Sequence, residues 1–337
     1  MPNETQNGPN GVATYKAFGL TVSSCIALPE LRPGAGGPQV TVRYGATPAE
    51  LPGATQNGAG YHSAYQSAPG QLLLDVHRFA RFLVRGGNEI VIDRQAEATD
   101  DDVRLFLLGP AFAALLHQRG ILTLHGSTIQ VQDGCVVFLG KCGMGKSTLA
   151  TELVRRGYAC LGDDICAISF GADGQPYALP AFPQARLWPQ SLEQFGIDPN
   201  ELRRIRPSRD KRCLPLERFS DAERLPVRRL YVLSYPTHDP ELTVKPMTGP
   251  PRIRVLRDNT YRVEFLPGLD QAPRHFQQIV HLASRVSIVR AFRKRKASDV
   301  KALARVVEND FLSECVPQGA CVGAGGPALP ALRPMLG

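Results

Sequence analysis

The stretch that decides the fold runs from His125 to Asp164 and reads HGSTIQVQDGCVVFLGKCGMGKSTLATELVRRGYACLGDD. Its centre, Gly140–Ser147, matches the pattern G-x-x-x-x-G-K-[ST] in full. The apolar run Cys135–Leu139 before it predicts a strand, and Ser147–Arg156 after it predicts a helix that ends at Gly157. A glycine-rich turn in that setting directs backbone N–H groups at one spot, beside the positive end of the helix. The stretch therefore predicts an α/β protein with a phosphate-binding loop.

The residues of this loop suggest how a nucleotide would be held. Lys146 offers a cation to the β- and γ-phosphates, and the Ser147 hydroxyl can ligate Mg²⁺. The remaining nucleotide contacts are expected from Gly140, Cys142, Gly143, Met144, Gly145 and Thr148. A fortuitous glycine turn is the alternative, but the flanking strand and helix favour the phosphate site. ATP and Mg²⁺ are the expected cofactors.

Two adjacent carboxylates are the feature that favours phosphotransfer, because motors, switches and transporters share such a loop. Asp163 and Asp164 follow the short strand predicted over Tyr158–Leu161. One carboxylate there would bind Mg²⁺, and its neighbour could accept the proton of an attacking hydroxyl. In the alternative interpretation, one aspartate binds the metal and the other is a turn or capping residue. His125, after the strand predicted over Ile121–Leu124, is by itself more often structural than catalytic.

Together these residues resemble the catalytic domain of the HPr serine kinase/phosphorylase family, which is related to the nucleotide-binding part of phosphoenolpyruvate carboxykinases. The family's order and spacing are matched by His125-Gly126, the strand into Gly140, the loop up to Ser147, the segment Glu152–Gly157 and Asp163-Asp164. The resemblance is strong over about residues 120–170. A weaker similarity covers PQARLW at Pro183–Trp188 and the C-terminal helices. That part resembles stand-alone HPr-kinase-like proteins, including those that phosphorylate a serine of lasso-peptide precursors.

The resemblance implies a fold and a set of residue roles. The fold would be a P-loop kinase of the HPr kinase/phosphoenolpyruvate carboxykinase type with a mixed central sheet. Lys146 and Ser147 would hold the phosphates and Mg²⁺, and His125 would lie beside the transferred phosphoryl group. Asp164 would be the general base, and Asp163 a metal ligand or orienting partner. The sequence leaves open which aspartate has which role.

Two departures from that family bear on the reaction. The bifunctional enzymes have an acidic residue directly after the loop serine, where this chain has Thr148. The glycine-containing signature that follows the aspartates in those enzymes, and is tied to phosphorolysis, is not found here. Both departures argue against a dephosphorylating activity. Residues 1–100 and the PQARLW region also differ from those of the bifunctional enzymes, which argues against HPr as the substrate.

The rest of the chain divides around the loop segment. The composition predicts a disordered N-terminus over 1–12, a β-rich N-terminal subdomain over 13–99, the catalytic domain over 100–314 and a flexible tail over 315–337. The elements expected within these parts are a strand at Gln71–Val76, a hairpin turning at Gly86-Gly87, a buried helix over Asp100–Gln118 interrupted at Pro110, strands at Arg229–Ser234 and Thr260–Phe265, and helices at Pro273–Ser284 and Ala297–Glu308.

A basic stretch, Arg203–Arg212, is the candidate for substrate binding. It could close over the nucleotide, or grip a carboxylate at the end of an acceptor peptide through Arg206, Lys211 and Arg212. The alternative is a solvated loop. Trp188 could lie under the site, but as the only tryptophan it is expected in the core.

Composition limits the partners. The 337 residues carry a formal charge of +8, but their basic clusters are not interleaved with aromatics as a single-strand stacking platform would be. A nucleotide or an acidic partner is therefore favoured over nucleic acid. No apolar stretch approaches the ~20 residues of a spanning helix, so no membrane partner is expected.

The N-terminus lacks a signal pattern, and the eight cysteines lack metal-site spacing, so a cytoplasmic protein with free thiols is expected. The oligomeric state stays open, a homo-oligomer included.

The function predicted from these features is transfer of the γ-phosphoryl group of ATP to a serine hydroxyl of a peptide or small protein, such as a natural-product precursor. One alternative is a kinase for an amino acid, sugar or other metabolite on the same scaffold. Another is a non-catalytic nucleotide-sensing regulator, and a nucleic-acid-dependent ATPase ranks last. A peptide acceptor would need an open groove, whereas a metabolite would need a closed pocket.

Overall fold

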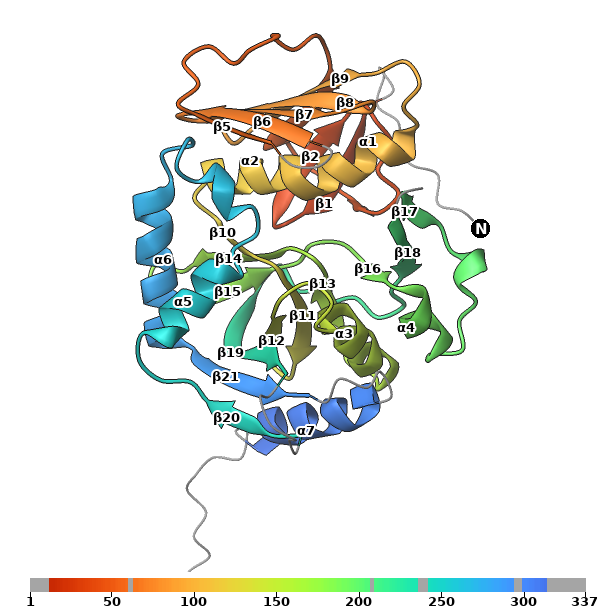
Figure 1. Ribbon diagram of the computed structural model, residues 1–337, viewed down its shortest axis with the longest axis vertical. Coiled ribbons are helices and arrows are strands. Elements are labelled where there is room, and N and C mark those ends of the chain that lie inside the picture. Colours follow the sequence, from red (N-terminus) through yellow and green to blue (C-terminus); the bar gives the residue numbers. More distant parts are fainter. Residues whose placement is uncertain (1–11, 60–62, 207–208, 236–241, 294–298, 314–337) are drawn as a thin grey trace, which may run out of the picture.

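The computed structural model describes residues 12–59, 63–206, 209–235, 242–293 and 299–313. The segment predicted to be disordered, 1–12, lies outside these ranges except for residue 12, and the predicted tail, 315–337, lies outside them entirely. Within them the chain is a mixed α/β protein with two large mixed sheets, drawn one above the other in Figure 1. None of the helices in the described ranges is both long and apolar enough to cross a membrane.

The first sheet comes from the N-terminal residues. In the described ranges its strand order is β3-β1-β2-β4-β9-β8-β7-β6-β5. The strands are β1 (Ala13–Ala17), β2 (Leu20–Ser24), β3 (Arg32–Pro33), β4 (Val40–Tyr44), β5 (Gln56–Ala59), β6 (Ser63–Ala68), β7 (Gln71–Val76), β8 (Ala80–Arg85) and β9 (Glu89–Arg94). The strand predicted at Gln71–Val76 is confirmed, and so is the hairpin, in which Gly86 and Gly87 adopt φ values of 59° and 65°. Such positive φ values are those of a tight hairpin turn.

An interrupted helix packs under this sheet (Figure 1). It consists of α1 (Asp100–Phe106), a π-helical segment (Leu107–Ala111) and α2 (Phe112–Gln118). Thr99 caps its start, because its hydroxyl accepts from the Asp102 amide while the Asp102 carboxylate accepts from the Thr99 amide. Pro110 lies in the π-helical segment, where its missing N–H interrupts the α-helical ladder. The predicted interruption is confirmed.

The second sheet positions the loop. Its strands are β10 (Leu122–Leu124), β11 (Gly126–Val131), β12 (Gly134–Leu139), β13 (Cys160–Gly162), β14 (Cys166–Phe170), β15 (Pro176–Leu179), β19 (Leu225–Ser234), β20 (Val244–Pro246) and β21 (Ser287–Phe292). The order is β10-β14-β15-β19-β12-β11-β13, with β21 beside β19. A small sheet holds β16 (Gln184–Leu187), β18 (Arg209–Pro215) and β17 (Arg204–Arg206). Because β12, β19 and β21 are parallel, their carboxyl ends meet at one edge, where α/β proteins bind ligands.

Helices cover both faces of the second sheet. Val136 and Phe138 of β12 pack with α3 (Lys146–Arg155) and α7 (Val300–Ser313). Cys135, Val137 and Leu139 point the other way, toward α5 (Pro251–Asp258) and α6 (Ala272–Arg285). Such burial on both faces explains why this strand is a continuous apolar run. The short helix α4 (Pro189–Glu193) and 3₁₀ turns at Pro199–Glu201 and Val263–Phe265 complete the described elements.

Two expectations were wrong. Thr260–Phe265 is not a strand: Thr260 forms an isolated bridge with Leu124, Arg262 adopts φ 56°, and a 3₁₀ turn follows. Its apolar residues serve a turn that packs Phe265 into the core under the first sheet. Trp188 is not in the core either, because it is 40% exposed.

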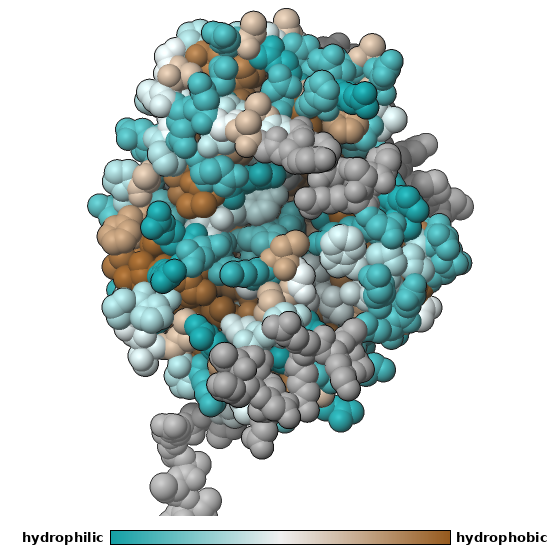
Figure 2. Space-filling model, viewed as in Figure 1, coloured by the Kyte–Doolittle hydropathy of each residue, from teal (hydrophilic) through white to brown (hydrophobic). Residues whose placement is uncertain are grey.

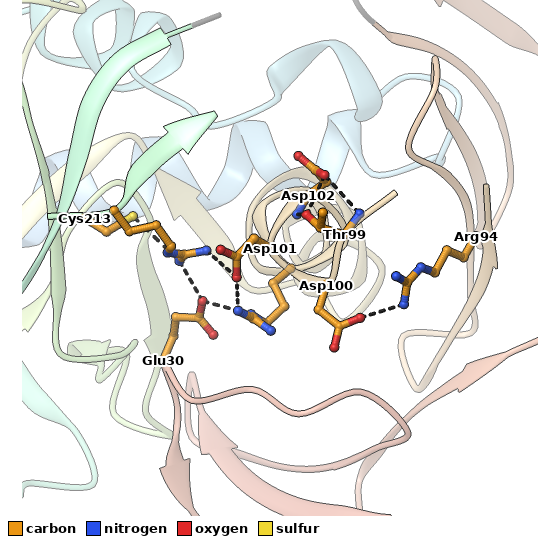
Figure 3. A network of polar contacts seen from close by, with 9 residues as sticks. Glu30, Arg94, Thr99, Asp100, Asp101, Asp102 and Cys213 are labelled. Atoms are coloured by element: carbon orange, nitrogen blue, oxygen red, sulfur yellow. Dashed lines mark hydrogen bonds and ion pairs between the residues drawn. The ribbon is translucent and has the colours of Figure 1, made fainter. Parts of the chain in front are cut away.

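A polar cluster joins the first sheet and its helix to the small sheet (Figure 3). The buried carboxylate of Glu30 accepts from Arg104 at 3.2 Å and from Arg203 at 3.0 Å. Arg203 also pairs with Asp101 at 2.8 Å, and Arg104 pairs with the same carboxylate. Two guanidinium groups and two carboxylates therefore link α1 to the residue just before β17.

Candidate active site

The glycine-rich loop connects β12 to α3 in the geometry that its sequence predicts. Gly140, Gly143 and Gly145 have φ values of 145°, 82° and 86°, and Gly145 caps the start of α3. These conformations suit glycine, because a Cβ is disfavoured there. The Lys146 ammonium donates to the Gly140 carbonyl at 2.7 Å, so the lysine folds back over the loop. Burial lowers the pKa of Lys146, and the nearby Asp163 and Asp164 partly offset that shift.

One cavity, of about 230 Å³, brings the predicted residues together. From the sequence-based set it is lined by His125, Cys142, Gly143, Gly145, Lys146, Ser147, Thr148, Asp163, Asp164 and Lys211. Residues that were not predicted to be at the site also line it: Arg186, Trp188, Tyr235 and Arg293. Gly140 and Met144 line a neighbouring groove instead. The loop and the paired carboxylates therefore face one space.

Asp163 is fixed at both oxygens. The Ser127 hydroxyl donates to Oδ1 at 2.6 Å, and the Arg186 backbone N–H donates to Oδ2 at 3.0 Å. The side chain is buried, yet the residue lines the cavity. Because a carboxylate oxygen has two lone pairs, each oxygen of Asp163 keeps acceptor capacity for a further partner.

Asp164 faces a guanidinium group. Its Oδ2 lies 2.8 Å from Nη1 of Arg186, and its backbone adopts a left-handed φ of 75°. Burial alone would raise the pKa of the Asp164 carboxyl, but Arg186 first, then His125 and two lysines, outweigh it and hold that pKa below its ordinary value. The carboxylate is therefore ionised at neutral pH and available to accept a proton.

His125 joins Asp164 through its ring. Its Nδ1 lies 3.0 Å from the backbone carbonyl oxygen of Asp164. Since a carbonyl only accepts, Nδ1 carries the proton and Nε2 keeps its lone pair. Burial lowers the pKa of His125, Asp164 opposes that shift and Lys146 reinforces it. The imidazole is therefore neutral at pH 7.

Arg186 and Arg293 are the charged lining residues that sequence reasoning missed. Arg186 lies inside the PQARLW segment, where an arginine among apolar residues is the available signal. Arg293 follows β21, and its Nη1 donates to the Met144 carbonyl at 2.9 Å. A Cβ placed on Gly145 would come within 2.1 Å of that same nitrogen. Arg293 therefore braces the loop beside Gly145, where any larger residue would have to displace the end of the arginine.

The basic stretch divides between two faces of β18. Lys211 lines the cavity, with its ammonium 5.6 Å from the centre of the Trp188 ring. Arg212 is buried elsewhere and donates to the Pro199 carbonyl at 2.8 Å. Neighbouring strand residues point to opposite faces, which is why only one of the two reaches the cavity. The side chain of Arg206 lies outside the described residues.

The residues suited to a metal ion here are the Ser147 hydroxyl and the Asp163 carboxylate, which offer the oxygen ligands that Mg²⁺ prefers. Over the described ranges, no group of three or more His, Cys, Asp and Glu side chains is placed to hold a metal. Magnesium sites with one or two protein ligands are completed by phosphate oxygens and water. The donor set therefore fits a magnesium ion that arrives with a nucleotide.

The cavity lies beside a glycine-rich loop between a strand and a helix of a mixed α/β protein. Comparison with curated proteins adds a distant relationship. The chain is 42% identical over 48 residues to the HPr kinase/phosphorylase of Thermoanaerobacter pseudethanolicus, and 43% identical over 44 residues to that of Chlorobium phaeovibrioides. These matches cover 14% and 13% of this chain, and only 16% and 13% of the relatives' own lengths. The similarity is thus confined to one short region.

Neither a comparison with solved structures nor one with models of known protein families assigns the chain to a family. The HPr(Ser) kinase/phosphatase structure from Coxiella burnetii matches 57% of this chain and 92% of its own, at 12% identity. Its TM-score of 0.32 is too low to establish a common fold. No model of a known protein family matches the chain.

Proposed function

We propose that this protein is a kinase that transfers the γ-phosphoryl group of Mg·ATP to a hydroxyl group, that of a serine in a peptide or small protein. The observation that carries the proposal is the shared cavity of the loop, the aspartate pair and His125. The short region of similarity to HPr kinase/phosphorylases suggests a kinase-like function and leaves the substrate open.

Binding comes first in the proposed reaction. The loop N–H groups at the start of α3 and the Lys146 ammonium hold the phosphates, and Arg293 keeps the loop in shape through the Met144 carbonyl. A nucleotide would draw Lys146 from the Gly140 carbonyl to the phosphates. Magnesium, held by Ser147 and Asp163, would neutralise charge on the phosphate oxygens.

Transfer requires an aligned hydroxyl and an acceptor for its proton. The ionised Asp164 carboxylate fits that task, and Arg186 holds it in place at 2.8 Å. A low pKa makes Asp164 a weak base, which suffices because phosphoryl transfer needs little proton abstraction before the bond to the leaving oxygen loosens. His125 fixes the Asp164 backbone through its Nδ1–H, which donates to the Asp164 carbonyl oxygen. The Nε2 lone pair on the other side of the ring is left free of this hydrogen bond. Positioning of the reactants and stabilisation of the phosphate charge therefore supply most of the rate enhancement.

The test is phosphotransfer by matched variants. Candidate acceptor peptides and proteins are incubated with Mg·ATP and examined by mass spectrometry for the phosphate mass. Lys146→Ala and Asp164→Asn should lower the rate by about 10²–10⁴-fold. Exposed residues with the same chemistry, Lys301→Ala and Asp133→Asn, should not. Full phosphotransfer by both site variants would refute the proposal.

A further inference from the structure

A larger hollow lies next to the proposed phosphate cavity. It has a volume of about 1530 Å³ and is bounded by the loop residues Gly140, Lys141 and Met144, the end of β19, and helices α5 and α6. Tyr235 lines both the cavity and this hollow, so the two are neighbours. Pockets for small ligands measure about 300–1,000 Å³. The hollow, called the acceptor groove below, is therefore large enough for a chain segment.

One side of the acceptor groove is apolar, with one exposed aromatic side chain. Phe276 of α6 is 57% exposed, and Ile253, Val263, Leu266 and Ile279 line the same groove. Figure 2 shows hydrophobic side chains gathered at the left of the molecule, over the region of α5 and α6 in Figure 1. Grouped apolar side chains in a groove, rimmed by polar residues, are typical of a binding site.

The charges of the groove are mostly positive. Its charged lining residues in the described ranges are Lys141, Arg254, Arg257, Arg290 and one carboxylate, Asp258. Arg254 and Asp258 are both exposed and lie 3.7 Å apart, a weak surface pair that an acceptor carboxylate can replace. His275 adds no charge at neutral pH, because burial and then Arg257 lower its pKa to about 4. The Nε of Arg290 is buried without a hydrogen-bond partner among the described residues. A ligand cannot reach that buried nitrogen, but Arg290 is only half-buried and lines the groove, so its guanidinium group can pair with a ligand carboxylate through its other nitrogens.

We propose that the acceptor groove binds the acceptor as a peptide segment that carries a carboxylate beside apolar side chains. The carboxylate pairs with Arg290 and Arg254, an apolar side chain packs against Phe276, and the serine reaches past Tyr235 toward Asp164. This inference rests on the proposed function and deepens it, because a groove of this size and charge selects a peptide over a free metabolite.

The test uses peptide display, which needs binding but no catalysis. A library of random peptides with one fixed serine is selected on the full-length protein in Mg·ADP, and in parallel on a double variant, Arg254→Glu with Arg290→Glu. The wild type should enrich peptides with Asp or Glu near Leu, Val or Phe. The double variant should bind those peptides at least about tenfold more weakly. Arg305→Glu, an exposed change on α7, should leave the selection unchanged.

Three results would overturn the inference. The wild type and the double variant could select the same sequences, or neither could enrich any sequence over a blank surface. Alternatively, sedimentation could show that the wild type self-associates and that Phe276→Ser abolishes this, which would assign the groove to a second copy of the chain. The proposed function fails separately, through full phosphotransfer by Lys146→Ala and Asp164→Asn.

Discussion

Replacing Gly145 by alanine tests how the loop keeps its shape. Gly145 has φ 86°, so any L-residue with a Cβ is strained there by about 1–2 kcal/mol. The new Cβ would also lie 2.1 Å from Nη1 of Arg293. The end of the arginine must then shift, and full loss of its charged hydrogen bond to the Met144 carbonyl sets an upper limit of about 1.5–3 kcal/mol on the extra cost. Gly145→Ala should therefore carry both penalties.

Gly143→Ala is the matched control. Gly143 has a similar φ of 82°, but a Cβ there would meet nothing within 4 Å. It should therefore carry only the backbone strain, so Gly145→Ala should lower the free energy of unfolding more than Gly143→Ala does, by at most about 1.5–3 kcal/mol. Denaturant unfolding of the full-length variants measures this difference, and calorimetric titration with Mg·ADP should rank their affinities in the same order.

The comparison becomes decisive in the background of Arg293→Ala. Without the guanidinium, Gly145→Ala should cost about as much as Gly143→Ala, because strain alone remains. Equal losses for the two glycine variants in the wild-type background would show that Arg293 does not brace the loop. If Gly145→Ala still lowered the free energy of unfolding more than Gly143→Ala in the Arg293→Ala background, this would also show that Arg293 does not brace the loop.

Three other predictions concern charge. Arg186→Gln removes the cation beside Asp164, so the pKa of that carboxyl should rise and the acid limb of the pH–rate profile should move to higher pH, while Mg·ADP still binds. Burial lowers the pKa values of His117 and His275 from 6.5 to about 4, so the stability they contribute is present above pH 6.5 and lost as pH falls toward 4. Each should cost about 2 kcal/mol at pH 5, and His117→Gln with His275→Gln should flatten the melting temperature against pH. Glu30→Gln removes one of the two carboxylates that Arg104 and Arg203 share, while Asp101 stays in place, so we expect a loss of about 1–3 kcal/mol in unfolding experiments, whereas Glu50→Gln, on the exposed surface, should change little.

The loop and its flanks were predictable because their determinants are local. Glycine spacing, the apolar run of β12 and the helix that ends before Gly157 all lie within one short stretch, and each specifies its own conformation. Asp163 and Asp164 were placed near the loop by the strand predicted before them and by the resemblance to HPr kinases, and the pairing of β13 with β11, the strand next to β12, brings them there. Short motifs in the sequence thus pointed to residues that share one cavity in the structure.

Residues brought in by tertiary packing could not be predicted in this way. Arg293 reaches the loop because β21 lies parallel to β19, a pairing that no local pattern in the sequence specifies. Arg186 reaches Asp164 through the small sheet formed by β16 and β18. The same limit explains the error at Thr260–Phe265, where β-prone residues fold as a turn because Phe265 packs under the first sheet. Trp188 was wrongly expected in the core because it is the only tryptophan. It lines the cavity instead, a position that depends on the tertiary fold.

A crystal structure with Mg²⁺ and a non-hydrolysable ATP analogue tests the central claim most directly. We expect the triphosphate to lie along the loop with its terminal phosphate between Lys146 and Asp164, and the metal to be bound by Ser147 and Asp163. A nucleotide bound away from the loop, or phosphates and metal out of reach of both aspartates, would contradict it.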